Sequence, residues 1–251
     1  MLGLPSSVTA CLFDLDGVLT KTASIHAAAW KEMFDSYLSA RAQRTGERFV
    51  PFDLNYDYDT YVDGKPRADG TRSFLASRSI TLPEGKPDDP PGIETVNGLG
   101  NAKNELVLRK IHDEGVQPYE GSIRYVRAAK LAGWHVAVVS SSANAHDVLV
   151  SAGIDDLFDV EIDGIVAQRD TLKGKPAPDT YLAGARALGV GPEHAAVFED
   201  ALSGVEAGRA GGFVAVVGVD RVGQAEALRA HGATIVVADL SELLGNDATV
   251  I

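Results

Sequence analysis

Two aspartates stand one residue apart directly after an apolar run near the N-terminus. The stretch "CLFDLDGVLTKTASIH" (residues 11–26) places Asp14 and Asp16 just before Gly17, where we expect the chain to turn. Asp14 then ends a strand and Asp16 lies in the loop, so both carboxylates reach one cavity with different surroundings. One can stay ionised as a nucleophile or metal ligand, and the other can be held protonated as an acid. Asp-Gly is also a common turn pair, so this stretch alone leaves a purely structural interpretation open.

Three more groups of polar side chains end apolar runs or precede helices further along the chain. Hydroxyls close "VVSSS", a lysine stands in "GKPAPD", and a carboxylate pair closes "VFEDA"; the residues are Ser140, Ser141, Ser142, Lys175, Glu199 and Asp200. Parallel α/β sheets bind ligands at the carboxyl ends of their strands, where these groups would meet. Taken singly, the serines or Asp200 could cap a helix and Lys175 could be an exposed loop lysine. Their occurrence together, in this order, favours a catalytic site.

The elements that must position these groups alternate between strands and helices. From Trp134 onward, short β-branched runs and helical segments follow one another at 134–140, 144–153, 158–164, 177–189, 194–200, 201–211, 213–219, 222–232 and 233–239. This alternation predicts βαβ units and a parallel sheet covered on both faces. Residues 8–14 add a strand of the same kind at the N-terminus. We therefore predict an α/β fold with a doubly wound, Rossmann-like core.

Between residues about 21 and 113 the alternation stops. Helical spacing appears at 22–42, 67–80 and 101–115, with a polar, tyrosine-rich stretch at 52–66 and a Pro- and Gly-rich loop at 82–98. An insertion at the end of the first strand would overhang the edge where such sheets bind ligands. We therefore predict two domains, a core of residues 1–20 and 114–251 and a mainly helical cap of residues 21–113.

Composition excludes several classes of protein. The chain has 251 residues, 45% of them hydrophobic, and a net charge of −12, which argues against a nucleic-acid-binding surface. No apolar run approaches the ~20 residues of a membrane helix, and no basic leader precedes the first strand. The single cysteine, Cys11, lies in an apolar run and is predicted to be buried. We expect a cytoplasmic monomer that binds neither nucleic acid nor membrane.

The four groups together resemble the motifs of the haloacid dehalogenase superfamily of phosphotransferases. Those motifs are Asp-x-Asp, a Ser/Thr after the second motif strand, a loop lysine and a late acidic pair, matched here by "DLD", "VVSSS", "GKP" and "FED". The resemblance implies that Asp14 is the nucleophile and forms an aspartyl-phosphate, and that Asp16 is the general acid/base. It implies that Ser140 and Lys175 bind the transferring phosphoryl group.

The same resemblance implies Mg²⁺ as the cofactor. The ligands that it implies are Asp14, Asp16 through its backbone carbonyl, Glu199 and Asp200. Hard oxygen ligands suit Mg²⁺ rather than zinc, and the chain has no zinc-type cluster of cysteine and histidine. A carboxylate that attacks a phosphate meets like-charge repulsion, which Mg²⁺ and Lys175 would offset.

The inserted region is similar to the cap of the β-phosphoglucomutase family. Thr22 and His26, in "TKTASIH", stand four apart on one helical face, and the family uses such a pair to place the acid/base aspartate as the cap closes. If Pro66 begins a helix, Arg67 lies in its first turn beside free N–H groups that suit a phosphate. The positions that the resemblance implies for binding the phosphosugar are Gly64, Lys65, Arg67, Lys103, Ser142 and Asn144. The loops 42–60 and 83–96 are longer than a compact cap of this family needs, and Ala201 stands where we expect serine.

The resemblance implies a mutase that interconverts β-glucose 1-phosphate and glucose 6-phosphate through glucose 1,6-bisphosphate. Such an enzyme must hold a bisphosphate in two orientations and keep water from the aspartyl-phosphate, so a cationic site in the cap is expected. Two alternatives stay open. The first is a sugar-phosphate phosphatase with the same core, in which water attacks the phosphorylated Asp14. The second is a non-catalytic binding protein on this fold, which the complete set of motif residues disfavours.

Overall fold

The computed structural model describes residues 2–245 and divides into two compact units. Met1–Lys21 and Val116–Ile251 form one unit, the core, and Thr22–Gly115 form the other, the cap. The sequence predicted a cap of residues 21–113, so the observed unit begins one residue later and ends two residues later. Each unit is described by itself below.

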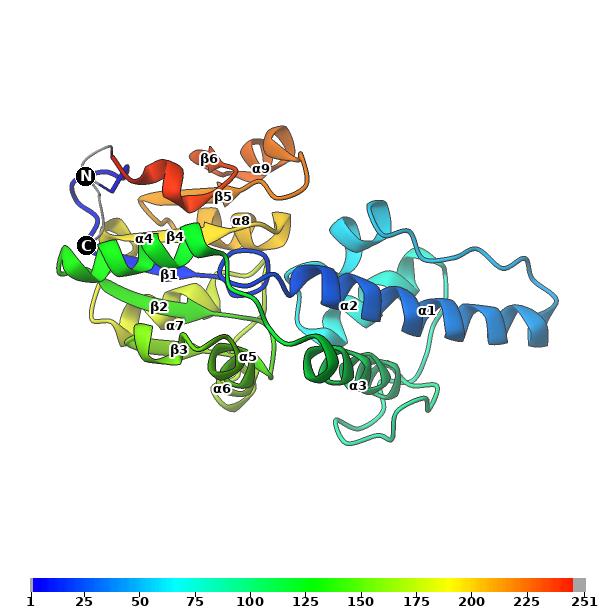
Figure 1. Cartoon of the computed structure of the whole chain (residues 1–251). Coiled ribbons are helices and arrows are strands. Elements are labelled where there is room, and N and C mark those ends of the chain that lie inside the picture. Colours follow the sequence, from blue (N-terminus) through cyan, green and yellow to red (C-terminus); the bar gives the residue numbers. More distant parts are fainter. Residues whose placement is uncertain (1, 246–251) are drawn as a thin grey trace. The chain divides into compact units, whose positions relative to one another are not determined.

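Six parallel strands form the sheet of the core, in the order β3–β2–β1–β4–β5–β6 (Figure 1). The strands are β1 (Ala10–Phe13), β2 (His135–Val139), β3 (Val160–Ile162), β4 (Ala195–Glu199), β5 (Ala215–Val219) and β6 (Ile235–Val237). Each one lies inside a predicted strand, and the predicted α/β class is confirmed. Strand β1 has β2 on one side and β4 on the other, so the connections change direction at β1. A ligand-binding crevice is expected at the carboxyl ends of the strands beside such a switch point.

Helices and short 3-10 turns connect these strands, and one further turn follows the last of them. They are α4 (Glu120–Leu131), α5 (Ala145–Ala152), η2 (Asp155–Leu157), α6 (Gly164–Arg169), α7 (Asp179–Ala187), η3 (Pro192–His194), α8 (Leu202–Ala210), α9 (Ala225–His231) and η4 (Leu240–Leu243). Helix α5 ends at Gly153, which adopts a left-handed φ of 66°, as predicted from its sequence. The sequence patterns do not predict α4 or α6.

Both faces of β1 are buried, which explains why its sequence is apolar throughout. On one face, Leu12 belongs to a hydrophobic cluster with Tyr181 of α7. On the other face, Phe13 stacks on Phe198 of β4 with ring centroids 4.4 Å apart, and meets Tyr125 of α4 edge-on at 6.3 Å. Cys11 is buried and free, as predicted. Burial on two sides is what a parallel sheet covered by helices requires.

Three α-helices and one π-helical turn build the cap: α1 (Ala23–Thr45), η1 (Tyr58–Val62), α2 (Arg67–Ser77) and α3 (Val96–Glu114). Two predicted boundaries are wrong. Pro66 is the N-cap residue of α2 rather than its first residue, because its ψ of 143° is extended. Helix α3 starts inside the predicted loop 82–98, because the Thr95 hydroxyl accepts the Gly98 N–H at 2.9 Å and caps the helix there.

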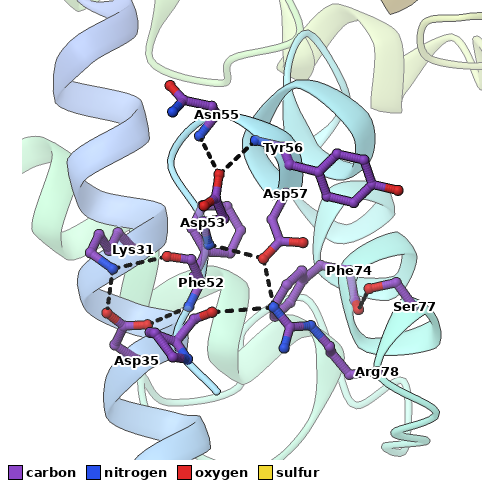
Figure 2. A network of polar contacts seen from close by, with 11 residues as sticks. Lys31, Asp35, Phe52, Asp53, Asn55, Tyr56, Asp57, Phe74, Ser77 and Arg78 are labelled. Carbon is purple, nitrogen blue, oxygen red and sulfur yellow. Dashed lines mark hydrogen bonds and ion pairs between the residues drawn. The ribbon is translucent and has the colours of Figure 1, made fainter.

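The long cap loop that precedes η1 is fixed to α1 and α2 by charged side chains (Figure 2). Phe52 packs against both Phe34 and Phe74, and its N–H donates to the Asp35 carboxylate at 2.7 Å. Asp57 is 4% exposed and accepts the Arg78 guanidinium at 2.6 Å, while Arg78 also donates to a backbone carbonyl of the loop at 3.2 Å. The loop is therefore an ordered part of the cap. Among residues 2–245, no helix is long and apolar enough to cross a membrane.

Candidate active site

The pairing of β1 with its neighbours fixes the position of Asp14. Phe13 pairs with Val138 of β2 on one side and with Phe198 of β4 on the other. Asp14 follows at once, and its N–H donates to the Phe198 carbonyl at 2.9 Å. Glu199 is the next residue of β4, so the register alone brings these two carboxyl groups to the same edge of the sheet.

Lys175 reaches this edge from the loop before α7. Its Nζ lies 2.5 Å from Asp14 Oδ1 and 2.6 Å from Glu199 Oε1, and it donates to the Val139 carbonyl at 3.1 Å. The Lys175 side chain is 1% exposed, so these partners replace the water that an ammonium would otherwise bind. Its interpretation as an exposed loop lysine is therefore wrong.

Burial and charge oppose each other at this cluster. Burial raises the pKa of Asp14 well above its ordinary value; Lys175 opposes that shift, and Glu199 and Asp16 add to it. Burial alone would lower the pKa of the Lys175 ammonium, but the carboxylates of Asp14 and Glu199 outweigh burial and raise it. The lysine therefore stays protonated and offsets part of the negative charge that these carboxyl groups carry when ionised.

Three of the predicted metal ligands lie together. Each of Asp14, Glu199 and Asp200 offers a carboxylate oxygen, and these atoms lie within 4.8 Å of one another, all in buried residues. With all three carboxylates ionised, one ammonium would leave a negative excess in a buried site, which a divalent cation would balance. Oxygen-only donors fit a hard ion such as Mg²⁺. Asp16, the fourth predicted ligand, is half-buried in the turn that follows Asp14.

Tyr181 is a member of the cluster that the sequence did not reveal. Its hydroxyl donates to Glu199 Oε1 at 2.7 Å, and its ring centroid lies 4.9 Å from Lys175 Nζ. The Ala201 N–H donates to the other oxygen of Glu199 at 3.2 Å. Glu199 is therefore held on both sides. The tyrosine falls on the buried face of a predicted helix, where its spacing marks it only as a core residue.

The hydroxyls after β2 order their own loop. Ser140 donates its N–H to the Ile162 carbonyl at 2.9 Å, and its hydroxyl accepts the Ser142 N–H at 3.1 Å. The Ser142 hydroxyl accepts the Asn144 N–H at 3.1 Å. Asn144, not a serine, is the N-cap residue of α5, and Ala201 rather than Asp200 is that of α8. The simpler interpretation of these residues as helix caps is therefore wrong.

Within the cap, Thr22, His26 and Lys103 occupy adjoining positions. Thr22 is the N-cap residue of α1, and its carbonyl accepts the His26 N–H at 3.0 Å. Lys103 Nζ, from α3, lies 3.0 Å from His26 Nδ1 and 4.9 Å from the ring centroid of Trp30. The predicted pair four residues apart therefore shares one turn of α1, and the cap lysine contacts its histidine.

The predicted cap residues before α2 have different surroundings. Gly64 adopts a left-handed φ of 68°, which favours glycine. Lys65 Nζ donates to the carbonyls of Thr60 and Tyr61, both at 3.1 Å, and so gives these carbonyls near the end of η1 a hydrogen-bond donor. Arg67 is the first residue of α2, and burial lowers the pKa of its guanidinium. In the part of the chain that the structure describes, this guanidinium forms no ion pair.

Known proteins place the chain in a family. A model of the haloacid dehalogenase-like hydrolase family matches residues 8–212. The chain belongs to this family. A β-phosphoglucomutase of Mycobacterium bovis is 59% identical over 97% of the chain and 94% of its own length. The solved structure of a β-phosphoglucomutase of Clostridium difficile has a TM-score of 0.70 and 25% identity, covering 94% of this chain and 93% of that one. A fructose-1-phosphate phosphatase of Escherichia coli is 30% identical over 82% of the chain and 93% of its own length.

These findings confirm the predicted superfamily and the Rossmann-like core with its inserted cap. They also count against the alternative of a non-catalytic binding protein, because the mutases and the phosphatase among these relatives are all named as enzymes. In this chain, groups from three of the four motifs meet at one edge of the sheet, beside β1: Asp14, Lys175, Glu199 and Asp200.

Proposed function

We propose that the chain is a Mg²⁺-dependent mutase that interconverts β-glucose 1-phosphate and glucose 6-phosphate through glucose 1,6-bisphosphate. The observation that carries this choice is the 59% identity to a β-phosphoglucomutase over almost the whole of both chains. The site supports phosphoryl transfer independently, because a carboxylate, an ammonium and two further carboxylates lie together in a buried cluster.

The proposed transfer uses Asp14 and Asp16 in turn. An Asp14 oxygen forms the new P–O bond while the bond from phosphorus to the sugar oxygen breaks, and Asp16 gives its proton to that sugar oxygen. Phosphorylated Asp14 in turn reacts with the 6-hydroxyl of β-glucose 1-phosphate: Asp16 removes the proton of this hydroxyl, whose oxygen bonds to phosphorus while the bond from phosphorus to Asp14 breaks, and the bisphosphate forms. Attack of Asp14 on the 1-phosphate of the bisphosphate then leaves glucose 6-phosphate. Lys175 offsets the negative charge of the attacking carboxylate and of the phosphoryl oxygens. Ser140 is proposed as a further donor to those oxygens.

The cluster also fits the proposed Mg²⁺. Asp14, Asp200 and the backbone carbonyl of Asp16 would hold the ion, with Glu199 beside it. When bound, Mg²⁺ supplies positive charge that neutralises the phosphoryl oxygens as charge develops on them. The acidic excess of the cluster supports this assignment.

Arg67 is the cap residue that we propose for the phosphate not being transferred. Its guanidinium is half-buried at the start of α2, near free backbone N–H groups, and an arginine in such surroundings is best compensated by an anion. We propose that Lys103, His26 and Thr22 act with it in the cap, and that Gly64, Lys65, Ser142 and Asn144 contribute to phosphosugar binding.

One incubation separates the mutase from a phosphatase. The protein is mixed with β-glucose 1-phosphate, Mg²⁺ and a trace of glucose 1,6-bisphosphate, and both products are followed. We expect glucose 6-phosphate to accumulate without free phosphate. Equimolar free glucose and phosphate would instead establish the sugar-phosphate phosphatase, the alternative that the similarity to the Escherichia coli enzyme favours.

Replacing Arg67 tests the cap's part in this proposal. We expect Arg67→Ala to reduce mutase turnover by about 10- to 100-fold, because a charge-assisted phosphate contact contributes about 1.5–3 kcal/mol. Cleavage of a small activated phosphate ester, which has no second phosphate, should change little. The control is Arg48→Ala, at an exposed arginine of the cap. Equal losses in both reactions would remove the reason for placing the second phosphate at Arg67.

We further propose that the protein acts as a monomer in the cytoplasm, in carbohydrate metabolism. A glucose phosphate is a small substrate of that compartment, and the net charge of −12 fits neither a nucleic acid nor an anionic membrane as partner.

A further inference from the structure

One loop of the core reaches two separate parts of the candidate metal site. It joins β5 to α9 and spans residues 220–224. Arg221 Nε donates to the Gly17 carbonyl at 2.9 Å, in the turn that follows Asp16. Gln224 Nε2 donates to the backbone carbonyl of Asp200 at 2.9 Å. The same short loop therefore holds the backbone beside Asp16 and the backbone of Asp200.

The turn beside Asp16 has little freedom of its own. Gly17 has a φ of 84°, and its N–H donates to the Thr20 carbonyl at 2.7 Å. A side chain at Gly17 would overlap the Asp200 carboxylate, so this backbone lies directly against a proposed metal ligand. A shift of the turn would therefore move the carbonyl of Asp16 relative to Asp200.

Arg221 is itself held from several sides. Its side chain is 14% exposed, and its guanidinium carbon lies 3.6 Å from the ring centroid of Tyr119. One nitrogen donates to the Ala238 carbonyl at 2.8 Å, and another lies 3.4 Å from the Val18 carbonyl. The guanidinium is thus a fixed, planar group that joins the turn after β1 to the segment after β6.

The loop that carries both side chains is rigid for a local reason. Asp220 Oδ1 accepts the N–H groups of Gly223 and Gln224, both at 2.7 Å. This arrangement fixes the path of the backbone between the two donors, as Asx turns do. A displacement of Arg221 would therefore also displace Gln224, and the reverse.

We propose that Arg221 and Gln224 are positioning residues that set the separation of the Asp16 backbone from Asp200 and, through it, the affinity of the site for a divalent cation. The inference rests on the proposed function, since it takes the metal ligands from there. Groups that orient metal ligands without touching the metal commonly change its affinity by about 10- to 100-fold when replaced.

The test measures metal binding in the absence of substrate. Mn²⁺ serves as the probe, and the free ion is followed by electron paramagnetic resonance as each protein is titrated. The variants are Arg221→Gln, Gln224→Ala and Arg221→Lys. We expect the first two to raise the dissociation constant for Mn²⁺ by about tenfold or more. Arg221→Lys should recover only part of the loss, because one ammonium cannot reach several carbonyls as a guanidinium does.

A matched control separates positioning from stability. Lys130 of α4 also donates to a backbone carbonyl of the core, that of Leu157 at 2.6 Å, but on the segment before β3. Lys130→Gln should lower the melting temperature and leave Mn²⁺ binding unchanged. Gln224→Ala removes one partly buried amide, so it should remain folded even if Arg221→Gln does not.

Two results distinguish this inference from the proposed function. Wild-type affinity for Mn²⁺ in folded Arg221→Gln or Gln224→Ala would overturn the inference, whatever sugar phosphate the enzyme converts. Weakened Mn²⁺ binding in both variants, with no glucose 6-phosphate formed by the wild type, would support the inference and refute the mutase.

Discussion

Replacing Lys175 with methionine tests the electrostatic account of the core site. Methionine is unbranched and one heavy atom shorter than lysine, and the substitution removes the ammonium that lies 2.5 Å from Asp14 and 2.6 Å from Glu199. The side chains of Lys175, Asp14 and Glu199 are 1%, 10% and 0% exposed, so water cannot solvate the carboxylates that lose their ammonium partner. Without metal, the variant should therefore fold less stably.

The size of the effect follows from the cost of an uncompensated buried charge. Removing one partner of a buried ion pair destabilises a protein by about 3–5 kcal/mol. The folded variant can escape part of this cost by protonating Asp14, whose pKa burial raises and Lys175 lowers, so that losing Lys175 raises it further. At pH 8, protonating an aspartate of ordinary pKa, about 3.9, costs about 5.6 kcal/mol, more than the cost of the unpaired charge, so protonation gives little relief. We expect a loss of about 3–5 kcal/mol at pH 8.

The pH dependence has a definite sign. A carboxyl group whose pKa is raised by folding stabilises fully below its ordinary pKa, and that stability is lost as pH rises through the folded value. As pH falls from 8, the destabilisation of Lys175→Met should therefore shrink by up to about 1.4 kcal/mol per pH unit below the pKa of Asp14 in the variant, until Asp14 of the wild type is protonated too. The protonation of Lys175 in the wild type does not change in this range, because its pKa is raised.

Urea unfolding measures the effect on the core. The chain has two tryptophans, Trp30 in the cap and Trp134 in the core, so a Trp30→Phe background lets Trp134 report on the core alone. Lys173→Met is the control, since Lys173 is an exposed lysine of the same loop. Lys175→Met with the stability of Lys173→Met at pH 8, or with a destabilisation independent of pH, would refute the reasoning.

Three further predictions concern single contacts. Asp14→Asn should abolish formation of the phosphorylated enzyme, and turnover surviving in that variant would contradict the assignment of the nucleophile. Tyr181→Phe removes the hydroxyl that donates to Glu199 at 2.7 Å, and should lower the free energy of unfolding of the core by about 2 kcal/mol, measured in urea by Trp134 fluorescence. Unchanged stability would mean that water takes the place of the hydroxyl. Arg78→Ala leaves the buried carboxylate of Asp57 without its ion pair, and should lower the free energy of unfolding of the cap by about 2 kcal/mol, read from Trp30 fluorescence. A cap as stable as that of Arg48→Ala would show that the loop does not depend on this pair.

Much of the candidate site could be predicted because its residues are marked by local sequence. Asp14, Ser140 and Glu199 each stand at the end of an apolar strand-like run, and the parallel sheet brings such ends to one edge. The roles assigned to them came from the resemblance to a family, which the comparisons confirm. The helix boundaries within the cap domain were harder to predict, because a single hydrogen bond can decide where a helix starts, as the bond from the Gly98 N–H to the Thr95 hydroxyl does for α3.

The contacts that fix the candidate catalytic groups could not be predicted in this way. Lys175 and Asp14 are 161 residues apart, and Arg221 and Gly17 are 204 apart. No spacing pattern relates such pairs, because their distance depends on strand order and on the paths of the loops. Nothing in the sequence distinguished Tyr181 from other buried residues of a helix or Arg221 from other loop arginines.

The sequence by itself therefore determined the alternation of strands and helices, the place of the inserted cap, and the motif residues, because side-chain period and local composition carry that information. Only the tertiary structure decided that Lys175 is buried between two carboxylates, and that Arg221 and Gln224 hold the backbone beside them. The physical reason is that β1 lies between β2 and β4, with β5 next, so groups remote in the chain share a small volume of low polarity. In that volume each charge or amide must find a specific partner, and those partners are chosen by the fold.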